Sequence, residues 1–335
     1  MKRRLFLMSA AGMAGCTRWG GARLNVFNWS SYVAPDTIPN FEKEYGVRVR
    51  YGVYESNEEM LAKVFSGNSG WDVVFPSNYF IGPMRAQGLL APLRHERLTN
   101  LSALDRRFQA PQWDAELRWS VPYMWSGTGI AYNRRLTPPP ARWADLWNRR
   151  LEGRITMLDD PAEVLGAALK KLGRSVNSTG TGDLRRAARE AIAQKPLLRA
   201  YLNAEVRDQL VAGDVVAAQL WGTTAQQAMD QSRDLAFVYP EEGFPLYADC
   251  AAILRESRRS DLAHRFLNYL LRPGVSADIS RAARTAACTL IPEDLRRNET
   301  LYPPPEVLQR GEWWQTPPAA VQRLRDRLWT EIKSV

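Results

Sequence analysis

Short apolar segments alternate with segments of helical spacing from Leu24 onward, and this alternation limits the fold more than any other feature of the chain. Asp36 can begin a helix that Gly46 ends, and alternating apolar residues at 47–53 then predict a half-buried strand. Strands that alternate with helices are typical of a parallel sheet covered by helices on both faces. The sequence therefore predicts the α/β class, with early strands and helices at residues 24–27, 36–45, 47–53, 60–65, 72–75 and 80–87.

The pattern changes after Tyr123, where residues 126–129 lead into an apolar segment and then a proline-rich turn at 137–140. A second series of strands and helices follows, and residues 251–271 resemble a return to the first series. A chain of 335 residues is long enough for one large domain or two medium ones. We expect the later elements at residues 130–133, 155–158, 161–171, 183–192, 217–221, 236–239, 251–254, 261–271 and 318–333.

Residues 1–16 have the features of an export signal rather than of a folded element. A basic start at 2–4 precedes an apolar run at 5–15 that is too short to span a bilayer. The run ends in Met-Ala-Gly before Cys16, which is similar to a bacterial lipobox, so cleavage would leave a lipidated Cys16 and a tether at 17–23. The paired arginines fit either a twin-arginine or an ordinary Sec signal. We expect the protein in the periplasm or on the outer face of the cytoplasmic membrane.

The net charge of +9 raises the question of a nucleic-acid partner. The arginines are dispersed through amphipathic segments such as 185–189 and 323–327, which is typical of solvated helix faces. We therefore expect no nucleic-acid partner, and membrane contact only through the anchor. With Cys16 assigned to the anchor, Cys250 and Cys288 remain. Export would permit a disulfide between them, but free buried thiols are the preferred interpretation, because the sequence does not define the Cα separation that a bridge requires.

The chain contains no motif of a known catalytic or cofactor site. Its histidines, His95 and His264, lie among charged residues and are expected at the surface. Zinc-protease, nucleophile-elbow and P-loop motifs are missing, as is a cysteine cluster, so we expect no cofactor, no metal and no enzymatic activity. Asp160 and Glu163 would share one helical face and could act as an acid–base pair. They also fit a capping box, with Pro161 at the first helical position.

Aromatic and polar side chains gather where the expected strands end. The first group is Asn28-Trp29-Ser30-Ser31-Tyr32, directly after the first strand. Ligands of open α/β sheets bind beyond the carboxyl ends of the strands. Aromatic faces and carboxylates together suit a small organic cation. The candidate binding residues are Trp29, Ser30, Tyr32, Ser77, Tyr79, Asp160, Glu163, Trp221, Tyr247 and Asp249.

Several short stretches occur in a fixed order: Asn28-Trp29-Ser30-Ser31-Tyr32, Tyr54-Glu55-Ser56-Asn57-Glu58, Pro76-Ser77-Asn78-Tyr79, Trp143-Ala144-Asp145-Leu146-Trp147, Asp159-Asp160-Pro161-Ala162-Glu163, Leu271-Arg272-Pro273 and Gly311-Glu312-Trp313. Together they resemble the spermidine/putrescine-binding proteins of bacterial ABC transporters. The resemblance covers residues 24–335. One such stretch alone would be weak evidence for this family, whereas the occurrence of all of them in the same order is specific to it.

This resemblance implies a two-lobed periplasmic binding protein of type II, in which each lobe has a mixed sheet flanked by helices and the ligand cleft lies between them. Lobe 1 would be 24–126 with 249–291, and lobe 2 would be 127–248 with 292–335. The strand-end candidates all match cleft residues of the family, and Thr285 stands at the position of a further one, a tyrosine. Such a receptor would be a monomer that closes by hinge motion on putrescine, spermidine or a related cation and delivers it to the transmembrane subunits of an ABC permease.

Some residues depart from the family pattern. The family has an acidic residue at the position of Ser31, a tryptophan at Tyr247 and a glycine at Arg284, and its glutamine after Glu-Trp aligns with either Trp314 or Gln315. These departures leave open a receptor for another small amine, or for an amino-acid-derived ligand whose carboxylate would pair with Arg284. Two further alternatives are a non-transport sensor and an exported hydrolase that uses the acid–base pair named above.

Overall fold

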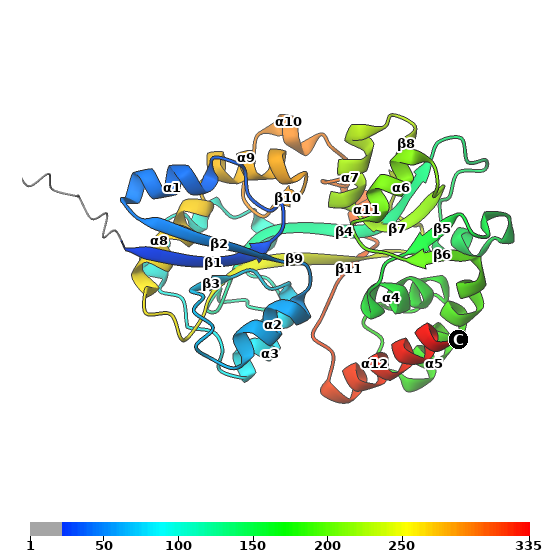
Figure 1. The fold of residues 1–335 in the computed structure, drawn as a ribbon, viewed down its shortest axis with the longest axis horizontal. Helices are drawn as coiled ribbons and strands as arrows, with labels where there is room; N and C mark the ends of the chain where they lie inside the picture. The colour runs from blue at the N-terminus through cyan, green and yellow to red at the C-terminus, as the bar shows by residue number, and fades with distance from the viewer. Residues whose placement is uncertain (1–21) are drawn as a thin grey trace, which may run out of the picture.

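The structure, a computed structural model, describes residues 22–335, and Figure 1 shows an α/β fold in two lobes that two long strands join. The lobe on the left contains β1 (Arg23–Trp29), α1 (Thr37–Tyr45), β2 (Arg48–Tyr54), α2 (Asn57–Phe65), β3 (Val73–Val74), α3 (Asn78–Ala86), α8 (Ser260–Leu270) and α9 (Pro273–Ala283). The lobe on the right contains β5 (Ile155–Met157), α4 (Pro161–Lys171), α5 (Thr181–Gln194), β6 (Leu198–Tyr201), α6 (Val206–Ala212), β7 (Ala217–Trp221), α7 (Gly222–Gln231), β8 (Leu235–Val238) and α12 (Ala319–Ser334). The joining strands are β4 (Val121–Asn133) and β9 (Phe244–Ile253), and further elements are β10 (Ala286–Ala287), α10 (Glu293–Arg296), α11 (Pro305–Leu308) and β11 (Gly311–Trp313).

One path of paired strands crosses both lobes in the order β2-β1-β3-β9-β4-β7-β5-β6. β1 pairs in parallel with β2 and β3, and β5 pairs in parallel with β6 and β7, because helical crossovers connect these strands. β9 and β4 run antiparallel to each other and to β3 and β7. The sheets are therefore mixed, and the expected α/β class is confirmed.

β4 changes its pairing partner part-way along. Residues 121–127 pair with β9, whereas residues 128–133 pair with β7 and β8. β9 pairs with β3 through 252–253 and with β11 through 244–246. Both strands therefore contribute to both lobes, and the change of partner in β4 lies where the lobes meet (Figure 1).

The ends of α1 and α4 show which of the expected capping residues form capping hydrogen bonds. Gly46 ends α1 in the left-handed conformation, with φ 63°, and its N–H bonds to the carbonyl of Glu42, as a glycine C-cap requires. Asp36 precedes α1, but its side chain makes no capping hydrogen bond, so that expected cap is not formed. Asp160 does cap α4, because Oδ1 accepts the N–H groups of Ala162 at 2.8 Å and Glu163 at 3.1 Å.

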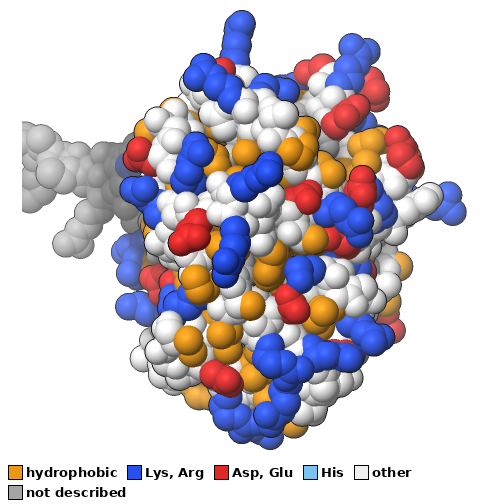
Figure 2. All heavy atoms as spheres, turned by 90° about the vertical axis from the view of Figure 1, so that its right-hand side faces the viewer, with side chains coloured by type: hydrophobic (Ala, Val, Ile, Leu, Met, Phe, Trp, Pro, Cys, Tyr) orange, Lys and Arg blue, Asp and Glu red, His pale blue; other side chains and the backbone are white. Residues whose placement is uncertain are grey.

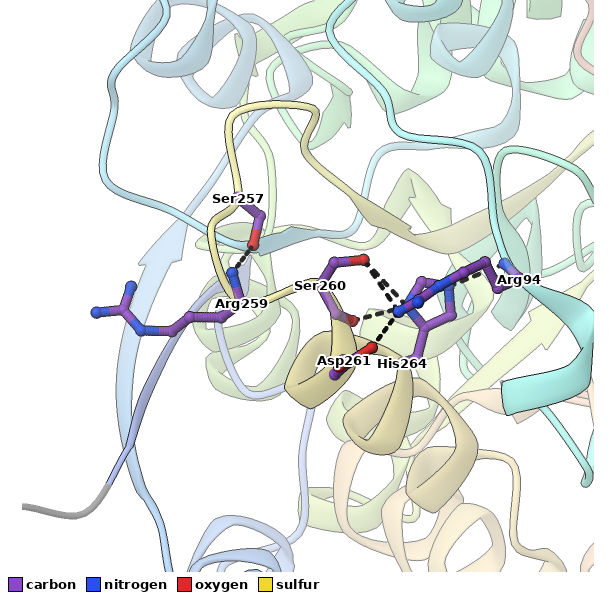
Figure 3. Close-up of polar contacts among 6 residues, drawn as sticks. All are labelled: Arg94, Ser257, Arg259, Ser260, Asp261 and His264. Carbon is purple, nitrogen blue, oxygen red and sulfur yellow. Dashed lines mark hydrogen bonds and ion pairs between the residues drawn. The ribbon is translucent and has the colours of Figure 1, made fainter.

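His264 is buried in α8, so the surface position expected from its charged neighbours is wrong. Its Nδ1 lies 2.7 Å from the carbonyl of Ser260, and its Nε2 accepts the backbone N–H of Arg94 over 2.9 Å (Figure 3). A carbonyl only accepts and an amide only donates, so the ring is neutral and carries its proton on Nδ1. The charged side chains of Arg94 and Asp261 pair with each other beside the ring. His95 is exposed, as expected.

Cys250 and Cys288 are both buried and free, which confirms the preferred interpretation. Cys250 lies on β9, opposite Pro122 of β4, whereas the N–H of Cys288 bonds to Tyr123 on the other side of β4. Two strand spacings of about 4.8 Å separate such positions. That distance exceeds the roughly 7 Å of Cα separation that a disulfide tolerates.

The expected export signal, Cys16 and most of the tether fall within residues 1–21, which lie outside the described residues, and β1 begins at Arg23, the last residue of the expected tether. Within residues 22–335, no helix is both long and apolar enough to cross a membrane. Figure 2 shows the end of the molecule that is on the right of Figure 1. Lys and Arg side chains are interspersed there with Asp and Glu over most of the face and gather toward its lower edge.

Candidate functional site

The segment after β1 is anchored to the strand that joins the lobes. Trp29 ends β1, and its Nε1–H donates to a backbone carbonyl just after β3 over 2.8 Å. Tyr32 is buried, and its hydroxyl donates to Oδ2 of Asp249 over 2.9 Å. Ser30 is half-buried and donates to Glu55. Of this first group of candidates, Tyr32 therefore contacts β9, whereas Trp29 and Ser30 bond to residues after β3 and β2.

Asp249 lies on β9 where the lobes meet and is 3% exposed. Its two oxygens accept hydrogen bonds from the hydroxyls of Tyr32 and Ser77, at 2.9 Å and 2.8 Å, and Asn57 holds Ser77 in turn. No ion pair among the described residues includes Asp249. Burial raises its pKa to about 7, although the two hydroxyl groups favour the charged form. The site thus contains a buried carboxyl group that lacks a positive partner.

Asp160 and Glu163 supply two further carboxyl groups at the start of α4. Glu163 is 3% exposed, its Oε1 accepts the Nε1–H of Trp314 over 3.4 Å, and its Oε2 has no hydrogen-bond partner. Burial, and then the charge of Asp160, raise the pKa of Glu163 to about 8. Burial also raises the pKa of Asp160, against the effect of its capping hydrogen bonds. Asp160 is therefore a helix cap and also part of an acidic site.

Tyr79, at the start of α3, lies in the field of carboxyl groups from both lobes. Burial raises the pKa of its hydroxyl well above the ordinary value. Four negative charges raise this pKa further, and they belong to Asp160, Glu58, Glu163 and Asp249. Carboxyl groups of the first lobe, the second lobe and the joining strand therefore all act on one tyrosine hydroxyl.

Two aromatic side chains flank the buried carboxyl groups. Trp221 ends β7 and is half-buried, and its indole lies near enough to Glu163 to favour the charged form of that carboxyl group. Tyr247 lies on β9 opposite Ser126 of β4, and after burial the charge of Asp249 is the next cause that raises its pKa. Each buried carboxyl group thus has a ring beside it, an arrangement that suits an organic cation.

Residues 37–289 match the family described as bacterial extracellular solute-binding protein. The chain belongs to this family. It is 32% identical to the putrescine-binding periplasmic protein PotF of Escherichia coli K12, over 93% of this chain and 91% of that protein. A solved structure from Listeria monocytogenes, assigned to a spermidine/putrescine ABC transporter, matches with TM-score 0.88 and 30% identity over 93% of this chain and 98% of that one. A Treponema pallidum lipoprotein, TpPotD, matches with TM-score 0.85 and 29% identity over 92% and 99%.

Membership confirms the expected two-lobed periplasmic-binding-protein fold and an extracytoplasmic location. It also assigns the chain to binding proteins rather than to enzymes, so the hydrolase alternative is wrong. The capping bonds that Asp160 makes to α4 already account for the spacing that suggested an acid–base pair.

The residues of this solute-binding protein that depart from the family pattern have partners within the chain or face solvent. Ser31 is exposed. Arg284 pairs with Asp230 at 2.6 Å, so its charge is already balanced. Thr285 is fully buried, accepts a hydrogen bond from Thr223 over 2.9 Å, and lies close enough to Tyr32 to affect its hydroxyl.

Sequence reasoning did not assign Glu58, Trp314 or Arg325 to the site. Glu58 belongs to one of the matching stretches, which was a usable signal. Trp314 was named only as an alignment alternative, yet it is 4% exposed and contacts the site. Arg325 shares the buried face of α12 with Leu328, but an arginine in an arginine-rich amphipathic helix is not distinguishable from its exposed neighbours by spacing alone.

Proposed function

We propose that this protein is the receptor of an ABC importer and binds putrescine, spermidine or a related organic cation between its two lobes. The observation that carries the proposal is a set of carboxyl groups that have no ion-pair partner among the described residues, those of Glu163 and Asp249, which are buried, and of Asp160, which is half-buried. A buried carboxylate is costly unless a cation balances it. The names of the relatives, which refer to putrescine and spermidine, support the same ligand class.

In this proposal, Asp249 accepts one ammonium group while the hydroxyls of Tyr32 and Ser77 orient its carboxylate. Glu163, together with Asp160, accepts the other end. A charge-assisted hydrogen bond contributes about 1.5–3 kcal/mol and a desolvated cation–π contact about 2 kcal/mol. Two or three of each, less the ordering cost, reach the roughly 8 kcal/mol of micromolar binding. The other proposed contacts are Trp29, Ser30, Tyr79, Trp221, Tyr247 and Thr285.

The proposed lobe boundaries remain 24–126 with 249–291, and 127–248 with 292–335. The change of partner in β4 between residues 127 and 128 supports the first boundary. The ligand would bind first to one lobe, and closure about the joining strands would bury it. That shift of population would be the signal that the permease reads.

We also propose that the protein is exported, anchored to the membrane by a lipid, and in contact with a permease. Residues 1–16 would direct export by the Sec or twin-arginine route, and Cys16 would carry the lipid that holds the protein at the membrane. The name of the Treponema pallidum relative, a lipoprotein, supports this anchor. The receptor would act as a monomer on the transmembrane subunits of the permease, with no nucleic-acid partner.

An amino-acid-derived ligand is the less favoured alternative. It would need a cation in the site to pair with its carboxylate, and the ion pair between Arg284 and Asp230 occupies the arginine that the sequence suggested for that role. The other alternative, a receptor for a different small amine, is compatible with the same carboxyl groups.

The test is calorimetric titration of the purified protein with putrescine, spermidine, spermine, a monoamine and an amino acid. Saturable 1:1 binding of a polyamine, with no heat from the amino acid, is the expected result. A folded sample that gives no signal with any amine would overturn the proposed ligand class and leave only the receptor fold.

A further inference from the structure

One face of α7 makes polar contacts with the other lobe. Its residues Thr223, Gln227 and Asp230 are separated by four and three positions, so they share one side of the helix. This side meets the end of α9, and both helices lie above the joining strands in Figure 1. Because α7 and α9 belong to different lobes, these contacts exist only while the two lobes are close together.

Two hydrogen bonds form part of this contact. The hydroxyl of Thr223 donates to the hydroxyl of Thr285 over 2.9 Å, and both residues are buried. The side-chain amide of Gln227 donates to the backbone carbonyl of Ala283 over 3.0 Å. Water can replace each partner when such groups separate, so their net contribution to stability is modest. The contact is therefore suited to form and break as the lobes move.

An ion pair between Arg284 and Asp230 completes the contact. Nε of Arg284 lies 2.6 Å from Oδ2 of Asp230, and the two side chains are 46% and 34% exposed. Oδ1 of Asp230 accepts the side-chain amide of Gln226 over 2.8 Å, and Gln226 in turn accepts the amide of Asn298 over 2.9 Å. The carboxylate is therefore held in place on α7, whereas the guanidinium comes from the other lobe.

The backbone at Arg284 indicates that its side chain has a role. Arg284 ends α9 in the left-handed conformation, with φ 55°. Glycine adopts this conformation without strain, whereas a residue with a Cβ adopts it at a cost in free energy. The ion pair with Asp230 is a contact that glycine could not make, and it accounts for an arginine at this position.

We infer that the ion pair of Arg284 with Asp230 is a latch between the lobes, which stabilises the closed receptor and so raises its affinity for the ligand. The inference rests on the proposed function, since it requires lobes that close around a ligand. The apparent affinity falls with the fraction of molecules in the binding-competent form. Because the latch forms after the ligand has entered, it slows dissociation rather than speeding association.

Two longer ion pairs also join the proposed lobes. Arg281 lies 3.8 Å from Asp294, and Arg296 lies 3.8 Å from Asp105. Asp294 and Arg296 both belong to α10, which begins just after the proposed end of lobe 1. Attraction between charges falls with distance, so the pair at 2.6 Å is the one to test.

The test measures putrescine affinity by calorimetry, and putrescine dissociation by stopped-flow tryptophan fluorescence, in Arg284→Gln and in the control Arg135→Gln. Arg135 pairs with Asp234 at 2.9 Å inside one lobe, so the control removes the same charge without affecting the contact between lobes. Arg284→Gln should bind about two- to fivefold more weakly than the control, through faster dissociation, and 1 M salt should abolish this difference. Equal or tighter binding by Arg284→Gln would overturn the inference.

Exchange of the two charges tests the contact itself. Arg284→Asp and Asp230→Arg each bring like charges together, so both should bind putrescine more weakly than the wild type. The double variant should return to within about twofold of the wild-type affinity. A general effect of charge on a cationic ligand would instead shift the affinities of the two single variants in opposite directions, and that result would overturn the latch.

Small-angle X-ray scattering of the unliganded proteins keeps this inference separate from the proposed function. Each single charge reversal should raise the radius of gyration toward an open form, and the double variant should lower it again. A wild type that binds no amine overturns the proposed function, and equal radii in all four proteins would then overturn the latch as well. If Arg284→Gln does not fold, Arg284→Gly, which suits the left-handed conformation, is measured against the same control.

Discussion

The hydroxyl of Tyr32 donates to Oδ2 of Asp249 over 2.9 Å, although 217 positions of sequence separate the two residues. Burial and the charge of Asp249 keep the pKa of Tyr32 well above its ordinary value, so the hydroxyl stays a donor. The bond connects the segment after β1 to the strand that joins the lobes. The carboxylate is therefore held in one orientation before a ligand arrives.

Replacing Asp249 with Asn should weaken putrescine binding by about tenfold to a hundredfold, because an amide does not balance an ammonium charge. The amide oxygen can still accept the hydroxyl groups of Tyr32 and Ser77, so the fold should persist. The unliganded variant should melt no lower than the wild type, since it no longer buries a carboxyl group. Calorimetry and thermal unfolding measure both effects, with the exposed Asp208→Asn as control. Unchanged affinity would remove Asp249 from the site.

Affinity for a diamine should rise with pH from about 6 to about 8.5. The pKa values of Asp249 and Glu163, about 7 and about 8, lie above those of ordinary carboxyl groups, so protons compete with the ligand below these values. Binding at pH 6.5 should therefore release protons. Titrations in buffers of different ionisation enthalpy measure this release, which Glu163→Gln should reduce. A release of zero in the wild type would contradict the assignment of these two groups as ligand acceptors.

Two substitutions at Asp160 separate its roles as helix cap and as charge. Asp160→Ser keeps an oxygen for the start of α4, whereas Asp160→Ala removes it, so the alanine variant should lose about 1 kcal/mol of unfolding free energy relative to the serine variant. Both lack the carboxylate, so both should lose the same factor of putrescine affinity. Denaturant unfolding measures the free energy of unfolding of each variant, and calorimetry measures its affinity for putrescine. Equal stability of the variants would show that the cap contributes nothing measurable.

His264 should make the protein less stable as the pH falls below about 6.5. Burial lowers the pKa of His264 in the folded state, so the unfolded chain takes up the proton first. The stability that the neutral, buried His264 provides is therefore fully present above the pKa of the unfolded state. It is lost as the pH falls from there toward the lower pKa of the folded state. Denaturant unfolding at pH 7.5 and 5.5 should show a smaller loss in His264→Leu than in the wild type. His95→Gln, at an exposed histidine, should keep the wild-type loss.

Local patterns predicted most of the fold. The alternation of apolar segments and helices, together with Gly46 as a helix end, identified the α/β class, because these signals depend on neighbours within one element. The same patterns failed where burial depends on distant segments. His264 was expected at the surface, yet the backbone of Arg94, from another part of the chain, covers its ring and accounts for its polar atoms.

The sequence by itself determined the kinds of side chain at the strand ends, and two of these residues, Tyr32 and Ser77, bond to Asp249 in the structure. Only the tertiary structure decided which carboxyl groups, those of Asp249 and Glu163, are buried without an ion-pair partner among the described residues. Trp314 and Glu163 lie 151 positions apart in the sequence, yet the indole N–H of Trp314 donates to Oε1 of Glu163 over 3.4 Å. Charge balance in a buried site depends on distances through space, and local periodicity contains no information about those distances.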